Sequence, residues 1–152
     1  MFLFIANTQG YHNVATKETG SNHCLVIPPT ELASSHELYD SRLTPKGIAQ
    51  AEQLKAYLAT RPSGSRSFTA FDLVVVSPLT RTCETALHIF GTPREPGKPA
   101  FLTQVDAPAG SPEREAGVTI APPRFLVREE CRERWGHYVC DGRRSISEIA
   151  KE

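Results

Sequence analysis

The chain has 152 residues, of which 39% are apolar and 22% are charged, so it is large enough for one domain with a single hydrophobic core. Seventeen Lys and Arg residues balance seventeen Asp and Glu residues. A net charge of zero gives no long-range attraction to nucleic acid or to an anionic membrane. We therefore expect a single domain over residues 1–152 with neither of these partners.

The chain begins with an apolar run, Met1–Ala6, that predicts a strand buried on both faces. This run is too short for a signal peptide or a membrane span. The polar stretch Asn7–Asn13 predicts a loop at the carboxyl end of that strand, which is where open α/β sheets bind ligands. Residues Lys17–Ser41 have no clear period, and we interpret them as a long irregular connection.

The most regular pattern begins at Thr44, which can cap a helix whose first turn accepts Pro45. Apolar residues then recur at helical spacing as far as the breaker cluster that starts at Pro62. Phe71–Val76 is a β-branched run that predicts a second buried strand, and Leu79–Phe90 predicts a second helix.

The later part of the chain has weaker signals. Thr92–Pro123 is rich in Pro and Gly and predicts a loop-rich segment with short strands at Ala100–Leu102 and Val118–Ile120. Arg124–Val127 predicts another short strand. Because strands and helices alternate, we expect an α/β fold with three layers, α/β/α, around a mainly parallel sheet.

The cysteines predict no zinc or redox site, because none of them has the paired CxxC spacing. Reduced thiols in the cytoplasm are the simpler interpretation, and a pairing of Cys131 with Cys140 has no secretory signal to support it. We expect no metal and no cofactor.

An arginine that could bind an anion follows the predicted strand Phe71–Val76. Arg81 falls in the first turn of the next helix, where the free N–H groups and the helix dipole attract anions. A guanidinium group can also bind a phosphate with two hydrogen bonds. The alternative is that Arg81 pairs with Glu84 or Glu52 on the surface.

Four segments together resemble the histidine phosphatase superfamily, the phosphoglycerate mutase-like family. Ser77–Ala86 is similar to the signature Ser-Pro-x-x-Arg-x-x-x-Thr-Ala, and Leu43–Ala51 to the helix Leu-Thr-x-x-Gly-x-x-Gln-Ala. Gln9–Asn13 resembles the stretch after Arg-His-Gly, and Cys131–Gly136 with Cys140-Asp141 resembles the acid-bearing segment. The resemblance implies a neutral histidine that attacks phosphorus, arginines that hold the phosphoryl oxygens, and an acid that protonates the leaving oxygen.

The resemblance places the Arg-His-Gly motif on Ala6-Asn7-Thr8, so Asn7 stands where the nucleophilic histidine belongs. An amide cannot attack phosphorus, and we expect catalysis to be impaired. His12 lies five positions further along, and an error of about 1 Å in placing a nucleophile costs about a hundredfold in rate. We therefore do not expect His12 to replace the missing group.

The same match implies Arg81 and Asn13 as phosphate ligands and Glu133 as the general acid. Glu129 is an alternative acid because the charged run allows a shift of register. The second phosphate-binding histidine of the family lies on a later strand that this chain does not reach, which implies a fold incomplete at the C-terminus.

Three functions remain open from the sequence. The first is a phosphoglycerate mutase-like protein with little or no turnover that keeps some affinity for a phosphorylated small molecule. The second is an active phosphomonoester hydrolase seen as a fragment or a faulty gene model. The third is a non-catalytic binding module that holds a protein partner at an open edge of the sheet.

Overall fold

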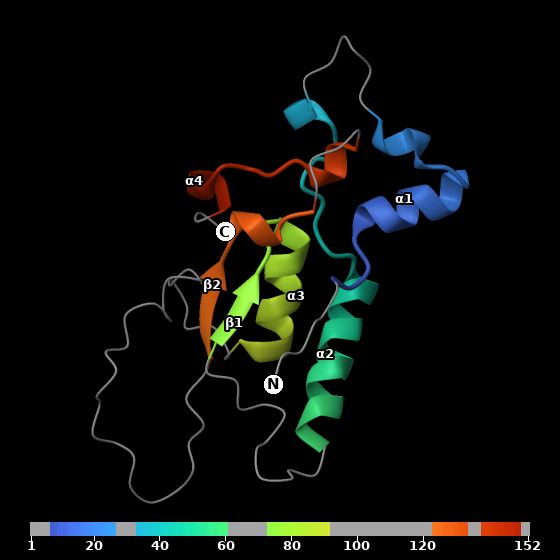
Figure 1. The fold of residues 1–152 in the computed structure, drawn as a ribbon. Coiled ribbons are helices and arrows are strands. Elements are labelled where there is room, and N and C mark those ends of the chain that lie inside the picture. Colours follow the sequence, from blue (N-terminus) through green and yellow to red (C-terminus); the bar gives the residue numbers. More distant parts are fainter. Residues whose placement is uncertain (1–6, 27–32, 61–72, 92–122, 134–137, 150–152) are drawn as a thin grey trace, which may run out of the picture.

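A computed structural model describes five stretches of the chain, residues 7–26, 33–60, 73–91, 123–133 and 138–149. Two parallel strands, β1 (Leu73–Val76) and β2 (Arg124–Val127), form the sheet, and Leu73 lies opposite Arg124 in the pairing. Helix α3 (Thr80–Phe90) packs on β1, and helix α2 (Pro45–Thr60) packs on α3 (Figure 1). The expected α/β class with a parallel sheet is confirmed.

The remaining elements are short. Helices α1 and α4 span Tyr11–Thr19 and Ile146–Ile149, and 3₁₀ helices span Asn22–Leu25, Ala33–Ser35, Glu129–Cys131 and Val139–Asp141. Figure 1 shows that α4 and the 3₁₀ helix Glu129–Cys131 lie beyond the carboxyl ends of both strands. The C-terminal part of the described chain therefore crosses the end of the sheet at which α3 begins.

Helix α3 joins two apolar clusters because its apolar residues recur three and four positions apart. Cys83 and Ala86 pack with Val76 of β1 and Phe125 of β2. Ile89, on another side of α3, packs with Ala51 and Leu58 of α2. Helix α3, which bears Arg81 in its first turn, is thus held by packing on two sides.

The helices and strands agree with most of the sequence-based expectations. α2 begins at Pro45, and the Thr44 hydroxyl accepts a hydrogen bond from the Gly47 N–H at 3.0 Å, as expected for a capping residue. The expected burial of the second strand is wrong in part, because Val76 is buried whereas the residues Leu73 and Val75 are 43% and 49% exposed. Within the described ranges, the apolar packing on β1 comes from its α3 side only.

The expectation of a continuous loop over Asn7–Asn13 and an irregular segment from Lys17 is also wrong in part. Tyr11–Thr19 is helical, with Gly10 at its N-cap, where the Gly10 N–H donates to Asn13 Oδ1 at 2.8 Å. Gly20 ends the helix with a φ of 66°, which glycine adopts readily. His12 is the only buried residue of α1, so this stretch lacks the apolar residues at helical spacing that would predict a helix.

Three expected strands, Met1–Ala6, Ala100–Leu102 and Val118–Ile120, lie outside the described residues. In the described ranges, Cys83, Cys131 and Cys140 carry free thiols, so the pairing of Cys131 with Cys140 is absent. No helix in these ranges combines the length and the apolar character needed to cross a membrane.

Candidate functional site

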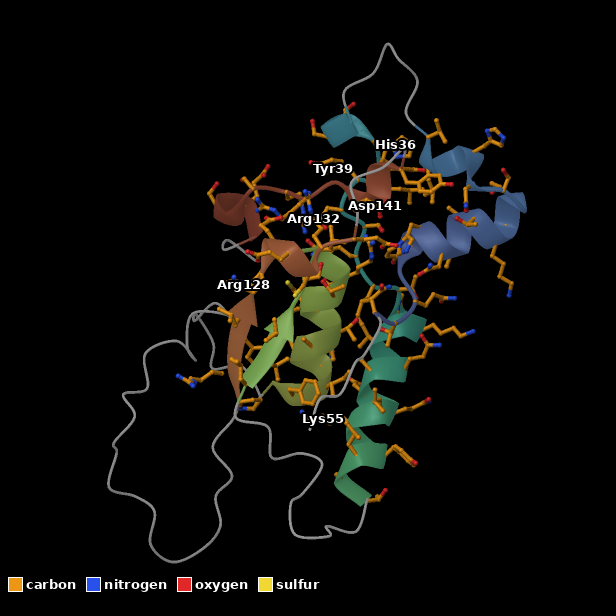
Figure 2. The ribbon with its side chains drawn as sticks, viewed as in Figure 1. His36, Tyr39, Lys55, Arg128, Arg132 and Asp141 are labelled. Carbon is orange, nitrogen blue, oxygen red and sulfur yellow. The ribbon has the colours of Figure 1, made fainter. Side chains whose placement is uncertain are left out.

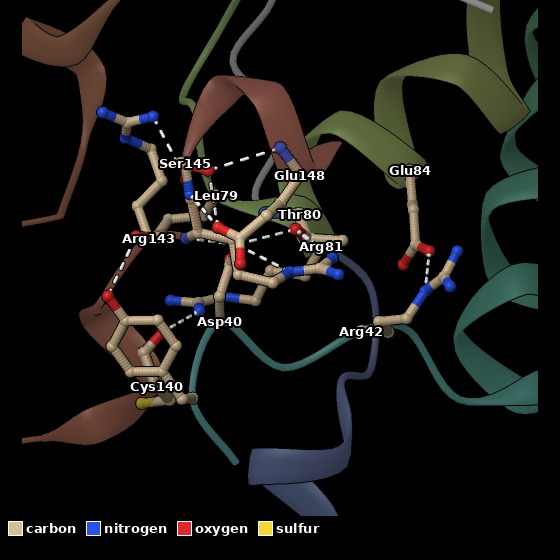
Figure 3. Close-up of polar contacts among 12 residues, drawn as sticks. Asp40, Arg42, Leu79, Thr80, Arg81, Glu84, Cys140, Arg143, Ser145 and Glu148 are labelled. Atoms are coloured by element: carbon tan, nitrogen blue, oxygen red, sulfur yellow. Dashed lines mark hydrogen bonds and ion pairs between the residues drawn. The ribbon is translucent and has the colours of Figure 1, made fainter. Parts of the chain in front are cut away.

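Arg81 is the centre of the candidate site, and its side chain is almost completely buried, with 1% of the residue exposed. Its Nη1 donates to the Cys140 carbonyl oxygen at 2.5 Å (Figure 3). Its Nη2 donates to Glu133 Oε2 at 3.2 Å and to Asp141 Oδ1 at 3.4 Å. The alternative in which Arg81 pairs with Glu84 or Glu52 is therefore wrong, since its ionic partners come from the C-terminal part of the chain.

Glu84 and Glu52, the partners considered for Arg81, are bound elsewhere. Glu84 accepts from Arg42 Nε at 2.7 Å and from the Leu43 N–H at 2.8 Å, and Figure 3 shows this pair apart from the contacts around Arg81. Glu52 lies 3.6 Å from His88 Nδ1. Glu84 therefore links α3 to the residues that lead into α2. The acids that contact Arg81 are Glu133 and Asp141.

The two acids considered for proton transfer lie in different surroundings. Glu133 has a side chain that is 66% exposed, and its carboxylate reaches Arg81. Glu129, which is exposed, lies 2.7 Å from the Nε of Arg143 and 3.4 Å from the Nε of Arg132, and both arginines are half-buried. The structure thus brings Glu133 to Arg81 and holds Glu129 with other arginines.

The loop that bears Asn7 runs beside the first turns of α3. Asn7 is half-buried, and its Nδ2 donates to the Thr8 carbonyl oxygen at 2.8 Å. The Thr8 N–H donates to Thr85 Oγ1 at 3.2 Å, and the Thr85 hydroxyl donates to the Arg81 carbonyl oxygen at 2.7 Å. The residue after Asn7, Thr8, is therefore hydrogen-bonded to Thr85, which in turn is hydrogen-bonded to the backbone of Arg81.

Helix α2 fixes the same loop from its other side. The Thr44 N–H donates to the Gln9 carbonyl oxygen at 3.0 Å, and the Gln9 N–H donates to Gln50 Oε1 at 3.1 Å. A Cβ atom on Gly47 would lie 2.1 Å from the Gln9 carbonyl oxygen. Only glycine at position 47 allows α2 to approach the loop this closely.

His12 lies at the edge of the site as a buried, neutral imidazole. It is 9% exposed, and its Nδ1 is 2.8 Å from Ser41 Oγ. Burial, together with the nearby positive charge of Arg81, lowers the pKa of His12 from 6.5 to about 4. His12 therefore places no charge beside Arg81 at neutral pH.

Asn13, the other expected phosphate ligand, has an exposed side chain whose Oδ1 caps α1 through the Gly10 N–H. The family resemblance implies a ligand role for this residue from its position in the motif. In the structure its side-chain oxygen stabilises the start of the helix that carries His12.

Two buried acids were not expected at the site from the sequence. Asp141 belongs to the segment compared with the acid-bearing part of the family, and it receives a hydrogen bond from Arg81. Figure 2 shows Asp141 and Tyr39 close to each other near the start of α3. Asp40 lies in the aperiodic segment Lys17–Ser41, where only its position just before the Leu-Thr-x-x-Gly helix could have drawn attention to it.

The buried thiols near the site are not nucleophiles at neutral pH. Burial, together with the carboxylate of Asp141, raises the pKa of Cys140 to about 12. Burial also raises the pKa of Cys83 to about 12. Among the described residues, no group of three His, Cys, Asp or Glu side chains could hold a metal ion.

Comparison with known proteins agrees with this architecture. Residues 31–98, which include α2, β1 and α3, match the family model described as "Histidine phosphatase superfamily (branch 1)". Over this central part the chain is similar to the histidine phosphatase superfamily. No solved structure gives a significant match.

Three curated proteins of Arabidopsis thaliana are similar to most of this chain. "Phosphoglycerate mutase-like protein" is 33% identical over 95% of the chain and 48% of its own length. "Phosphoglycerate mutase-like protein 1" is 31% identical over 95% and 46%, and "Phosphoglycerate mutase-like protein 2" is 35% identical over 90% and 35%. The chain thus spans about half or less of the length of the curated relatives it matches.

Proposed function

We propose that this chain is a phosphoglycerate mutase-like scaffold that binds a phosphoryl group or a similar oxyanion weakly at Arg81 and does not hydrolyse phosphomonoesters. The observation that carries the proposal is the identity of residue 7. Asn7 is half-buried beside the first turns of α3, and its Nδ2 is a donor to the Thr8 carbonyl oxygen. An amide nitrogen has no basic lone pair, so no covalent phosphoryl intermediate can form there.

The contacts of Arg81 support weak oxyanion binding. Glu133 is the partner that an oxyanion can replace, because its side chain is largely exposed and can turn away. The Arg81 Nε–H has no hydrogen-bond acceptor within the described ranges, so it offers the entering anion a further donor. Asp141 stays beside the guanidinium as a second negative charge, which keeps the affinity low.

Glu133 takes the place of the general acid in this proposal. Its carboxylate contacts Arg81 in the free chain, so a Glu133 side chain displaced by the phosphoryl group would still border the site and could reach the leaving oxygen. Proton transfer from Glu133 gives no turnover here, because the attacking group is missing. In the same proposal the ligand is a phosphorylated small molecule and the location is the cytoplasm. A protein partner would bind at an open edge of the sheet.

Hydrolysis of 4-nitrophenyl phosphate by the purified 152-residue chain tests the proposal. The unmodified chain and Arg81→Ala are expected to give only the background rate. Asn7→His is the matched gain-of-function variant, and any rate that it gains should disappear in the double variant Asn7→His with Arg81→Ala. Turnover by the unmodified chain that Arg81→Ala abolishes would instead favour the active hydrolase.

A further inference from the structure

The first turn of α3 has no cap of its own. The N-cap residue, Leu79, has an apolar side chain that accepts no hydrogen bond from the helix N–H groups. Asp40 supplies the acceptor from 40 positions earlier in the chain. Its Oδ1 accepts from the Thr80 N–H and its Oδ2 from the Thr80 hydroxyl, each at 2.8 Å. A carboxylate in this place also complements the positive end of the helix dipole.

Asp40 is held in an unusual environment for a carboxylate. It is 1% exposed, and its φ of 45° lies in the left-handed region. Aspartate and asparagine are among the few residues other than glycine that tolerate this backbone conformation. A buried carboxylate is unfavourable unless it is hydrogen-bonded, so Asp40 depends on its contacts with Thr80 and Arg144.

Asp40 also binds the C-terminal segment that surrounds Arg81. The Arg144 N–H donates to Asp40 Oδ2 at 3.1 Å, and Arg144 Nη2 donates to Thr80 Oγ1 at 2.9 Å (Figure 3). Four positions before Arg144, the Cys140 carbonyl oxygen accepts from Arg81 Nη1. The adjacent residues Thr80 and Arg81 of α3 are thus both hydrogen-bonded to the segment 140–144. Asp40 contributes to the contact of Thr80 with Arg144.

We infer that Asp40 is the positioning residue of Arg81: it fixes the first turn of α3 and holds the Arg144 segment against it, so that the guanidinium keeps its place. The inference rests on the proposed oxyanion role of Arg81. Asp40 touches no ligand in this scheme and acts through Thr80 and Arg144. Releasing Arg144 loosens the same segment that supplies Cys140 and Asp141 to the guanidinium.

Asp40→Asn is the central variant, because asparagine tolerates the left-handed backbone and keeps one oxygen for the Thr80 N–H. It removes the charge and places an amide NH₂ where Oδ2 now accepts from Thr80 and Arg144. Thr80→Val is a second variant that removes only the hydroxyl link and keeps the N–H. Glu84→Gln is the matched control, because Glu84 is also a carboxylate near the start of α3 but accepts its hydrogen bond from Arg42.

Two readouts separate the positioning role from the proposed function. The first is the NMR resonance of the buried Arg81 Nε–H, assigned by its loss in Arg81→Lys, which reports the guanidinium without any ligand. The second is the Kd for inorganic phosphate from an NMR titration. We expect Asp40→Asn to move the Nε resonance and to weaken phosphate binding by about tenfold, as the loss of one charge-assisted hydrogen bond would. Thr80→Val should do the same to a smaller extent, and Glu84→Gln should do neither.

Three results decide the inference. An unmoved Nε resonance in folded Asp40→Asn and Thr80→Val overturns it, whether or not phosphate binds. Where phosphate binding by the unmodified chain depends on Arg81, a moved resonance with unchanged phosphate affinity also overturns it, because the position of Arg81 would then not matter for binding. If the unmodified chain and Arg81→Ala bind phosphate equally poorly, the proposed oxyanion role fails, and a moved resonance still supports the positioning of Arg81 by Asp40.

Discussion

Burial of His12 in its neutral form makes the stability of this chain dependent on pH. The pKa of His12 falls from 6.5 in the unfolded chain to about 4 in the folded chain. Between these values the unfolded chain binds a proton that the folded chain does not, so stability decreases as the pH falls from 6.5 to 4. Above pH 6.5 the imidazole is neutral in both states and the effect vanishes.

The size of the effect follows from the two pKa values. At about 1.4 kcal/mol for each pH unit, acidification from pH 7 to pH 4.5 removes at most about 2.7 kcal/mol, and solvent screening at the ring edge reduces this to about 2 kcal/mol. His12→Gln removes the titration and retains a group that can hydrogen-bond to Ser41. The difference in free energy of unfolding between the unmodified chain and His12→Gln should therefore shrink by about 2 kcal/mol over this range.

Urea unfolding of both proteins at pH 7 and pH 4.5, followed by circular dichroism, measures that difference. Carboxylates also titrate in this range, but they contribute equally to the two proteins and cancel in the comparison. His23→Gln is the control, because His23 is exposed, and its difference from the unmodified chain should not change with pH. A constant difference for His12→Gln would refute the assignment of a buried neutral imidazole.

Three further predictions concern the loop, the acid and the C-terminal segment. Glu133→Gln should strengthen phosphate binding about two- to fivefold in an NMR titration, because it removes a partly exposed competing charge from Arg81; weaker binding would contradict this. Gly47→Ala should lower the free energy of unfolding by about 2 kcal/mol or more, since its Cβ would overlap the Gln9 carbonyl oxygen; a neutral effect in urea unfolding would argue against the close approach. Tyr39→Phe should cost about 1 kcal/mol in the same assay, because the Tyr39 hydroxyl donates to the Arg143 carbonyl oxygen at 2.9 Å.

The sequence predicts the elements that repeat an apolar period. α2 and α3 carry apolar residues at helical spacing, such as Ala51, Ala86 and Ile89, and the two strands are short apolar runs. The positions of these elements and the parallel sheet therefore follow from the sequence pattern. The place of Arg81 at the start of α3 follows from the strand that precedes it, whereas the sequence did not predict that this side chain is buried. The family resemblance implies that Arg81 and Glu133 belong to one site, and the 3.2 Å contact between Arg81 Nη2 and Glu133 Oε2 agrees with this.

Other features have no local signal. α1 is polar on most sides, so its existence depends on the Gly10 and Asn13 cap and on the packing of His12. Asp40 acts on Thr80 across 40 positions of sequence, and only a folded chain brings the two together. The exposed side of β1 reflects which elements pack on the sheet, and a β-branched run does not reveal whether one face or both are covered.

The central claim is that no covalent phosphoryl intermediate forms on this chain, and intact-mass spectrometry tests it most directly. The unmodified chain is incubated with 4-nitrophenyl phosphate or acetyl phosphate and is kept at alkaline pH, because phosphoramidate bonds to histidine break in acid. Asn7→His serves as the comparison. The account predicts an unchanged mass for the unmodified chain. A phosphoryl adduct that peptide mapping places on His12, or on any other residue beside Arg81, would contradict it.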